Sequence, residues 1–568
     1  MTCSQQAPAP WRQATVLAGL VLSVLGLLAW AVAQGRPVPL PDAVDLRVPC
    51  VSYAPFRRPN HSPFDPTLHL KQAEIEADLR LLREMTSCVR TYGVDHGLDA
   101  VPAIARALGM RVVLGAWIGG DAAANVVQLE RALALGREYA DVVDLLVVGN
   151  EVLLRGEQTP EALAALLARA RRESSVPIAY ADVWAFWLRY ADVLRDHVDV
   201  VAIHVLPYWE DEPVSVAQAV EHVVAVNAQM RAFFAPLPVF VGETGWPAAG
   251  RQRGPAVPGR LEQTRFVREL LAFNARALFG SQAVAGPGIN LIEGFDQPWK
   301  RRLEGAMGGY WGMFDADGRP RVTLRGVVVG DPQWWRVPLG MVIGSVAGWL
   351  WARGHGTACS AAGEVALRRR LLTCSAMGVA GAGIVALALL QWQMLLEWSR
   401  SPLDWALGVS AATTAGLCAL AAAGRLARIL IGTSSPGSRP GVLAALRTAS
   451  ARGTQALALA QVVLLCSVVL IAKGLLFDAR YRPLVWPLFA APAVLLLALT
   501  VLGDRLDRGA WLERALAAVC AIAAVLLVGQ EGLVNTQALG LALIWLALAV
   551  AVGWPQSFVS ASGTEATG

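Results

Sequence analysis

The stretch Leu145-Leu146-Val147-Val148-Gly149-Asn150-Glu151-Val152 decides the fold. It is an apolar run of strand length that ends in an amide and a carboxylic acid. Buried parallel strands are nearly continuous apolar runs, and the active sites of barrel enzymes lie at the carboxyl ends of the strands. Glu151 therefore stands where chemistry, rather than packing, is expected.

A second stretch has the same form about 90 residues later. It reads Leu237-Pro238-Val239-Phe240-Val241-Gly242-Glu243-Thr244-Gly245-Trp246-Pro247, a short apolar run followed by glycine and glutamate. Two glutamates at strand ends are what a two-carboxylate glycosidase needs, one as acid/base and one as nucleophile or base. The alternative is that each acid forms a buried ion pair with Arg90 or another arginine of the domain.

The segment from about residue 36 to residue 336 alternates short apolar runs with stretches of helical period. The expected strands are Val48–Pro55, Cys88–Gly93, Arg111–Ile118, Val143–Val152, Pro177–Trp184, Val198–Leu206, Leu237–Trp246 and Ile289–Trp299. The expected helices include Leu70–Thr86, Ala122–Tyr139, Thr159–Glu173 and Arg260–Leu278. Such alternation predicts an α/β domain with a parallel sheet, and eight units match a (β/α)8 TIM barrel. An open doubly wound sheet is the alternative, although no glycine-rich phosphate loop follows the first strand.

The composition points to a membrane. Hydrophobic residues make up 55% of the 568 residues, too many for a wholly soluble protein, and the excess lies in the C-terminal part. The formal charge of +5 comes almost entirely from arginine. Because no basic patch interleaved with aromatic residues accompanies it, nucleic acid is not an expected partner.

The N-terminus carries an apolar run from Ala14 to about Ala33, which is about 20 residues and enough to cross a bilayer. We expect one uncleaved transmembrane helix there. A cleaved signal peptide is the alternative, since Ala31-Val32-Ala33 is a small-residue pattern. Arg12 on the near side predicts a cytoplasmic N-terminus and an exported domain after it.

An α-helical multi-span membrane domain is expected after the barrel. The expected spans are near 335–352, 372–395, 405–424, 455–473, 484–502, 512–529 and 537–554. Arginines gather in the loops near 353–371, 425–453 and 503–511, which predicts that these loops are cytoplasmic. The expected domains are therefore an anchor at 1–35, the exported barrel at 36–333, the membrane domain of about seven helices at 334–554, and a tail at 555–568. Few ionisable groups lie at mid-membrane, which argues against an ion-coupled transporter.

Cys50 and Cys88 occupy similar positions on the first two expected strands. Those strands are neighbours in a barrel, and an oxidising compartment would permit a bridge between them. Two buried thiols are the alternative. The remaining cysteines show no paired metal spacing, and no metal or cofactor is expected.

The two glutamate motifs resemble the acid/base and nucleophile signatures of glycoside hydrolase family 17, the β-1,3-glucanase family. Other segments agree with that family in order: Val51–Phe56, Val89–Gly93, His204–Trp209, Glu293–Lys300 and Tyr310–Asp315. The resemblance covers about residues 48–325. Together with the multi-span C-terminus, it is similar to bacterial membrane-bound members that are often labelled β-(1,6)-glucan synthases or act as glucan transglycosylases.

The resemblance implies a retaining mechanism through a covalent glycosyl-enzyme. Glu151 would be the acid/base and Glu243 the nucleophile, with their carboxyls about 5–5.5 Å apart. The chemistry requires different pKa values for the two carboxyls, a raised pKa for the acid and a low pKa for the nucleophile. Asn150 would bind the sugar 2-hydroxyl.

Further substrate-binding residues are expected around the pair: Tyr53, Arg90, Tyr92, Asn150, His204, Tyr208, Trp209, Trp246, Trp299 and Lys300. The aromatic side chains would stack on sugar rings, with packing at the barrel rim as the alternative. His204 would bond a hydroxyl or Glu243, or be a satisfied core histidine. Many family members carry glutamate where this chain has Gln297, which puts the Glu–Lys pair of the family in doubt for Lys300.

The expected function is a membrane-anchored retaining glycosidase or transglycosylase that remodels, branches or cyclises periplasmic β-1,3-glucan. The alternatives are a non-catalytic component for β-glucan binding or export, and a plain hydrolytic endo-β-1,3-glucanase. A synthase that uses a nucleotide sugar is disfavoured because no nucleotide-binding domain is evident. The expected partners are a β-glucan substrate, the lipid bilayer and a glucan synthase. The expected location is the bacterial inner membrane, with the barrel facing the periplasm.

Overall fold

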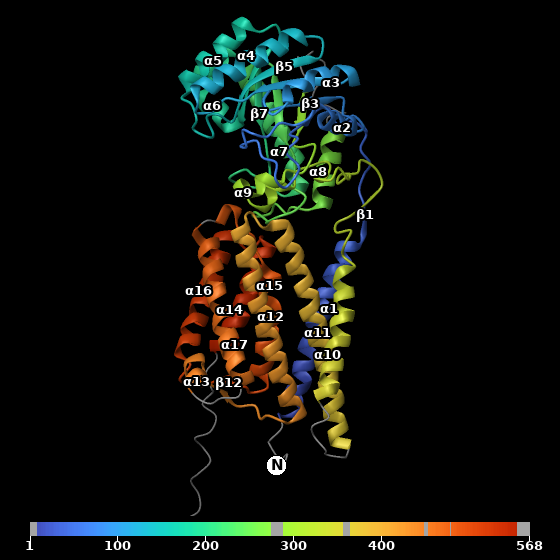
Figure 1. Cartoon of the computed structure of the whole chain (residues 1–568), viewed down its shortest axis with the longest axis vertical. Helices are drawn as coiled ribbons and strands as arrows, with labels where there is room; N and C mark the ends of the chain where they lie inside the picture. Colours follow the sequence, from blue (N-terminus) through green and yellow to red (C-terminus); the bar gives the residue numbers. More distant parts are fainter. Residues whose placement is uncertain (1–7, 274–287, 356–363, 448–451, 478, 554–568) are drawn as a thin grey trace, which may run out of the picture. The chain divides into compact units, whose positions relative to one another are not determined.

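Figure 1 shows the computed structural model, which describes residues 8–273, 288–355, 364–447, 452–477 and 479–553. The expected tail at 555–568 lies outside these residues. The chain forms two compact units. One is Pro37–Gly330, and the other combines Met1–Arg36 with Asp331–Gly568.

The first unit contains a closed barrel of eight parallel strands, in the order β2 to β9. The strands are β2 (Val51–Ser52), β3 (Cys88–Arg90), β4 (Arg111–Ala116), β5 (Val143–Asn150), β6 (Ile178–Val183), β7 (Val200–His204), β8 (Val239–Thr244) and β9 (Ile289–Leu291). Each lies within one of the eight apolar runs of the sequence. The predicted barrel is therefore confirmed, because β2 pairs with both β3 and β9 and closes the sheet.

Helices follow the strands as the apolar period requires. They are α2 (Gln72–Leu82), α3 (Val101–Leu108), α4 (Ala122–Glu138), α5 (Pro160–Glu173), α6 (Trp184–Leu194), α7 (Val216–Phe234), α8 (Arg260–Phe273) and the short α9 (Arg301–Glu304). Side chains cap two of them: Asp121 accepts from the N–H groups of Ala123 and Ala124, and Thr159 accepts from that of Ala162. Residues 274–278 of the helix expected at 260–278 lie outside the described residues.

Alternation along the strands separates two cores. Side chains such as Val112 and Leu114 join the large core under the helices, whereas Val113 and Phe240 belong to a small cluster of residues from neighbouring strands. We place that cluster inside the barrel, since inward and outward residues alternate along barrel strands. It includes Cys50 and Cys88, which form a disulfide with their Cα atoms 4.5 Å apart. The bridge was one of two open alternatives, and the structure resolves it.

Two short strands join the ends of this unit. β1 (Pro37–Pro39) pairs with β10 (Val327–Val329) in antiparallel register, Pro37 opposite Val329. Both strands have only three residues and β1 contains two prolines, so they carry little sequence signal, and this pair was not expected.

The second unit is helical. Its helices are α1 (Pro10–Gly35), α10 (Arg336–His355), α11 (Glu364–Trp398), α12 (Pro402–Ile431), α13 (Val442–Arg447), α14 (Arg452–Phe477), α15 (Trp486–Val501), α16 (Trp511–Glu531) and α17 (Thr536–Gly553), and two short strands, β11 (Ser438–Arg439) and β12 (Arg505–Leu506), pair in parallel. Among the described helices, six are long and apolar enough to cross a membrane: α1, α11, α12, α14, α16 and α17.

Two expected spans are not among these six. The run near 484–502 forms α15, which has only 16 residues and measures about 24 Å at 1.5 Å per residue, short of a hydrocarbon core of about 30 Å. The run near 335–352 forms α10, whose glycines, tryptophans and arginine lower its mean hydropathy. A count of apolar runs overlooks both features, the short length of α15 and the low mean hydropathy of α10.

Candidate active site

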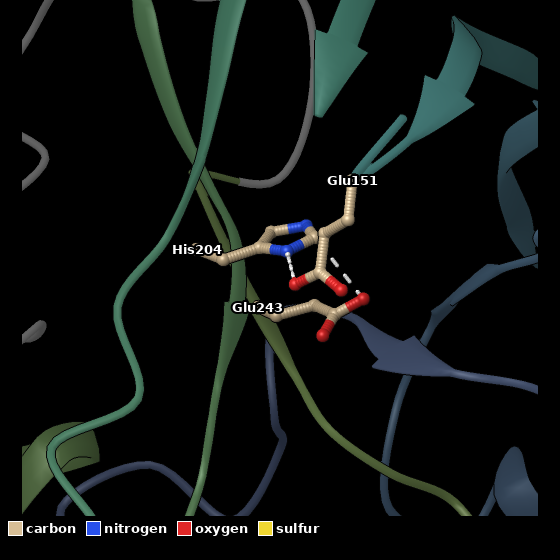
Figure 2. A group of neighbouring side chains, drawn as sticks. All are labelled: Glu151, His204 and Glu243. Atoms are coloured by element: carbon tan, nitrogen blue, oxygen red, sulfur yellow. Dashed lines mark hydrogen bonds and ion pairs between the residues drawn. The ribbon is translucent and has the colours of Figure 1, made fainter. Parts of the chain in front are cut away.

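Three side chains from three strands converge at the carboxyl end of the barrel. Glu151 follows β5, His204 ends β7 and Glu243 lies in β8. Figure 2 shows both carboxylates and the imidazole pointing toward one another. One ligating atom from each residue lies within 4.8 Å of those of the other two.

The backbone after β5 is shaped to present Glu151. The register of β5 against β6 shifts between Val147 and Asn150, and Gly149 and Glu151 adopt positive φ angles of 85° and 53°. A side chain at Gly149 would clash, because its Cβ would lie 2.7 Å from Cγ2 of Val152. Positive φ is unfavourable for glutamate, and such strain persists only where surrounding contacts impose it. One such contact is the Glu151 N–H, which donates to the carbonyl of Ala181 at 2.7 Å.

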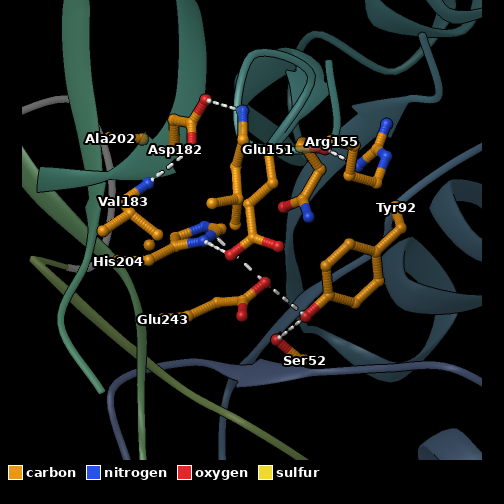
Figure 3. Close-up of polar contacts among 12 residues, drawn as sticks. Ser52, Tyr92, Glu151, Arg155, Asp182, Val183, Ala202, His204 and Glu243 are labelled. Atoms are coloured by element: carbon orange, nitrogen blue, oxygen red, sulfur yellow. Dashed lines mark hydrogen bonds and ion pairs between the residues drawn. The ribbon is translucent and has the colours of Figure 1, made fainter. Parts of the chain in front are cut away.

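Glu243 is held by donors on β3 and just after it, although β3 does not pair with β8. Its Oε1 accepts from Nη1 of Arg90 at 3.2 Å and from the hydroxyl of Tyr92 at 2.8 Å. Arg90 also donates to Oδ1 of Asn150 at 2.6 Å, so one guanidinium orients both residues. Figure 3 shows Tyr92 between Glu243 and Ser52, whose Oγ lies 2.8 Å from the same hydroxyl. The buried ion pair with Arg90 that we considered for the two acids is thus present at Glu243.

His204 links the two acids. Its Nδ1 lies 2.7 Å from Oε1 of Glu151, and its Nε2 lies 3.6 Å from Oε1 of Glu243. Nε2 also lies 3.4 Å from Nη1 of Arg90. Because that guanidinium can only donate, we place the ring proton on Nδ1, where it is donated to Glu151. The imidazole is fully buried, whereas the side chain of Glu151 keeps 23% of its surface exposed.

The electrostatics of Glu151 differ from the expectation. Burial acts to raise its pKa, but the hydrogen bond from His204 and the nearby guanidinium groups of Arg155 and Arg90 act together to lower it, and the lowering prevails. The pKa of Glu151 therefore lies below its ordinary value, and the raised pKa expected for an acid catalyst is wrong for this structure. Two ionised carboxylates with oxygens no more than 4.8 Å apart would repel by at least about 3.5 kcal/mol at an effective dielectric of about 20. His204 and Arg90 lie where they offset this repulsion.

Lys300 forms the carboxylate pair that the Gln297 substitution had put in doubt. Its Nζ donates to Oε2 of Glu293 at 2.8 Å, while Gln297 donates to the carbonyl of Ala54 and accepts from Nε1 of Trp299. Burial raises the pKa of Glu293 to about 7, against the lowering charge of Lys300.

The predicted aromatic residues divide into two groups. Tyr92, Trp209 and Trp299 are half-buried. The rings of Tyr53, Tyr208 and Trp246 are fully buried, and their polar atoms donate to Asp78, to the carbonyl of Arg251 and to the carbonyl of Val257, respectively. The three rings of the second group have no exposed face for a sugar, so for them the alternative, packing at the barrel rim, applies.

Four further residues near the acids were not predicted: Ser52, Arg155, Glu293 and Glu304. Glu293 had a signal, because it follows the apolar run Ile289–Ile292 as Glu151 and Glu243 follow theirs. Glu304 lies on α9, and burial raises its pKa to about 7, with Lys300, Glu293, Glu151 and Glu243 all close enough to affect it. Ser52 carries no local signal, because its contacts come from Tyr92 and Asn290. Arg155 donates to the carbonyl of Asn150 nearby in the chain, but no sequence pattern marks it.

Glu151, His204 and Glu243 also form a group whose spacing could hold a metal ion. The guanidinium of Arg90 contacts the carboxylate oxygen of Glu243 that would face such an ion. A fixed positive charge at that place fits a carboxylate pair balanced by protein groups, and the donor set suits a divalent cation poorly.

Known proteins match the barrel. Residues 50–312 match the model of the BtgE/BtgC glycoside hydrolase domain. A glucan 1,3-beta-glucosidase of Arthroderma benhamiae is 31% identical over 276 residues, which cover 44% of this chain and 83% of that protein. A probable beta-glucosidase btgE of Aspergillus fumigatus is 25% identical over 234 residues, or 40% of this chain and only 39% of that protein.

Among solved structures, a glycoside hydrolase family 17 beta-1,3-glucanosyltransferase from Rhizomucor miehei is similar at 22% identity with a TM-score of 0.40, covering 49% of this chain and 97% of that one. An endo-laminarinase from Formosa is similar at 20% identity with a TM-score of 0.38, covering 48% and 84%. The barrel, the paired carboxylates and the match to the Arthroderma protein agree. The chain belongs to the family of BtgE/BtgC glycoside hydrolase domains and is a glycosidase-type enzyme.

Proposed function

We propose that the barrel is a retaining enzyme that cleaves β-1,3-glucan through a covalent glycosyl-enzyme. The observation that carries this proposal is the approach of Glu151 and Glu243, whose ligating oxygens lie within 4.8 Å. Retaining glycosidases place their carboxyls about 5–5.5 Å apart, whereas inverting ones leave about 6.5–9.5 Å for a water molecule. The short separation favours retention.

In the first step, Glu243 attacks the anomeric carbon while the bond to the leaving sugar oxygen breaks. Arg90 and Tyr92 hold the attacking carboxylate in place. Glu151, in its protonated form, donates its own proton to the leaving oxygen, while the Nδ1–H group of His204, 2.7 Å away, holds its carboxyl in place.

In the second step, Glu151 takes a proton from the acceptor, which attacks the glycosyl-enzyme and frees Glu243. Asn150 is suited to bind the sugar 2-hydroxyl, since Arg90 fixes its Oδ1 and its Nδ2 has no hydrogen bond within the described residues. Contacts to this hydroxyl strengthen in the transition state. Lys300, Trp209 and Trp299 are the remaining predicted residues with exposed surface, and we assign them to substrate binding.

β-1,3-Glucan is proposed as the substrate because the Arthroderma relative is named a glucan 1,3-beta-glucosidase. Six long apolar helices support a membrane-anchored enzyme, and the arginine-rich loops support a barrel on the periplasmic side of a bacterial inner membrane. An enzyme kept at the membrane is placed to remodel newly made glucan, so we favour transfer to a sugar over hydrolysis.

The full-length chain, purified in detergent, tests these proposals on laminari-oligosaccharides. Products longer than the substrate, with β-configuration in the first-formed bond, are expected for a retaining transferase. Only shorter products would replace transfer by hydrolysis. Unchanged turnover in Glu243→Gln would refute the catalytic assignment and favour a protein that binds or exports glucan.

A further inference from the structure

Two side chains of β6 hold the backbone of the loop that carries Glu151. The hydroxyl of Tyr180 accepts from the N–H of Leu153 at 3.1 Å, and Oδ2 of Asp182 accepts from the N–H of Leu154 at 3.4 Å. Figure 3 shows Asp182 beside this loop. The strand β6 thus supplies the acceptors for two consecutive N–H groups that follow the acid/base.

Asp182 has the surroundings of an ionised carboxylate. Its side chain is fully buried. Its Oδ1 accepts from the N–H of Val183 at 2.7 Å, and its Oδ2 accepts from the hydroxyl of Tyr180 as well as from the loop. An ionised carboxyl acts only as an acceptor, which matches these contacts. Burial raises the pKa of Asp182 to about 6, while the hydrogen bond from Tyr180 opposes the rise and the charge of Glu151 adds to it. Asp182 is therefore mostly ionised at neutral pH.

The backbone that these two residues hold is strained. Glu151 has a φ of 53°, which is unfavourable for any residue with a side chain. The register of β5 against β6 shifts just before it, and a Cβ added at Gly149 would lie 3.4 Å from Cε2 of Tyr180, so the tyrosine ring packs against the irregular segment. If Glu151 relaxed to a negative φ, its side chain would leave the direction that places its carboxyl 2.7 Å from Nδ1 of His204.

We propose that Tyr180 and Asp182 are positioning residues for Glu151, an inference that rests on the proposed function. They hold the loop in its strained conformation, so that the carboxyl of Glu151 points at the oxygen of the leaving sugar. Both side chains are fully buried, so they act through the loop and not on the substrate. The nucleophile Glu243 takes its hydrogen bonds from Arg90 and Tyr92 instead, and its attack does not depend on β6.

The test compares two substrates on the full-length chain in detergent. Asp182→Asn keeps the size of the side chain but puts an N–H donor group where one of its oxygens accepts hydrogen bonds. Misplacement of a reacting group by about 1 Å costs about 10²-fold in rate, so kcat on laminari-oligosaccharides is expected to fall by about that factor. KM is expected to stay unchanged, because the proton of Glu151 is needed only in the transition state. A β-glycosyl fluoride, whose leaving group needs no protonation, should be cleaved close to the wild-type rate.

Two further variants complete the comparison. Tyr180→Phe removes one acceptor of the loop and one donor to Asp182, and it should show the same difference between the substrates with a smaller loss. Asp78→Asn is the matched control. Asp78 is also a buried aspartate that accepts from a tyrosine hydroxyl, but its partners are Tyr53 and Arg57 and not this loop, so both substrates should be cleaved as by wild type.

Hydrogen exchange tests the loop independently of activity. In Asp182→Asn and Tyr180→Phe, the peptide that covers residues 149–156 should exchange faster than in wild type, whereas in Asp78→Asn it should not. A wild type that cleaves neither substrate would refute the proposed function. Unchanged exchange in both β6 variants would refute the positioning role alone. Equal losses on the fluoride and the oligosaccharides in Asp182→Asn would also overturn it.

Discussion

Replacing Glu151 by glutamine tests the proposed chemistry most directly. The amide keeps the size of the side chain and can still accept the hydrogen bond from Nδ1 of His204, which is 2.7 Å long in the native site. It has no acidic proton for the leaving oxygen. A general acid contributes about 10²–10⁴-fold to the rate, or about 2.7–5.5 kcal/mol. We therefore expect kcat/KM on laminari-oligosaccharides to fall by this factor.

The same substitution should leave the nucleophile able to attack. The amide removes the repulsion of at least about 3.5 kcal/mol that an ionised Glu151 would exert on Glu243 across no more than 4.8 Å. A glycosyl fluoride needs no protonation of its leaving group. Its cleavage by Glu151→Gln should therefore stay close to the wild-type rate for the first step, and added azide should yield a β-glycosyl azide.

Glu157→Gln is the matched control for this experiment. Glu157 lies on the same loop and pairs with Arg155 at 2.6 Å, with both side chains partly exposed. Such pairs are worth about 0–1 kcal/mol, so turnover should change by less than about fivefold. The reasoning fails if Glu151→Gln cleaves oligosaccharides within about tenfold of wild type, below the range for a general acid. It also fails if the fluoride and the oligosaccharides lose the same factor.

Three further predictions concern the barrel. Tyr92→Phe removes a hydrogen bond of 2.8 Å to Glu243, worth about 1.5–3 kcal/mol at a charged group, and should lower kcat/KM roughly ten- to a hundredfold. The hydroxyl of Tyr53 bonds Asp78 instead, so Tyr53→Phe should stay close to wild type, and equal losses in the two variants would count against the assignment. Lys300→Met removes the charge that lowers the pKa of Glu293, which burial has raised from 4.5 to about 7. Because the pKa of Glu293 is higher in the folded state than in the unfolded state, the variant should lose about 1.4 kcal/mol of stability per pH unit above pH 4.5, until the pH passes the folded pKa of Glu293. Thermal melts from pH 5 to pH 8 measure this slope, and a flat profile would contradict it. Replacing both bridged cysteines by alanine should cost about 2–4 kcal/mol, seen as a lower denaturant midpoint for the near-ultraviolet signal of the barrel, and an unchanged midpoint would show that the bridge adds no stability.

The fold was predictable because its signals are local. Each strand of the barrel is visible in the sequence as an apolar run, and the runs of β5 and β8 are followed within a few residues by glycine and glutamate. Strand ends meet at one face of a barrel whatever the intervening loops contain. The pairing of Glu151 with Glu243 therefore needed no knowledge of register.

The contacts of the site were less predictable because they depend on register across several strands. His204 lies between both acids only because of the shift between Ile203 and His204 in the pairing of β7 with β8. The positive φ of Glu151 follows from the irregular pairing of β5 with β6. No pattern in the sequence of one strand carries either fact, and the pKa of Glu151 was expected in the wrong direction for that reason.

Lys300 shows a different limit. Its expected partner was sought at position 297 by comparison with a family pattern, whereas the chain supplies Glu293 four residues earlier. The rule that identified the first two acids, an apolar run followed by glutamate, also applies to Glu293. The pattern at the end of the β9 run therefore identifies the partner of Lys300, whereas the family spacing does not.

The pairing of β1 with β10 bears on how such a protein arises. The first and last segments of the barrel unit run side by side, Pro37 opposite Val329, so the chain enters and leaves this unit at one place. A module built this way can be spliced between two helices of a host without stretching either junction, since the gap to be bridged is only about 4.8 Å, the spacing of neighbouring strands. Replacing the barrel by another domain whose two ends lie equally close together would change the reaction while leaving the host helices as they are.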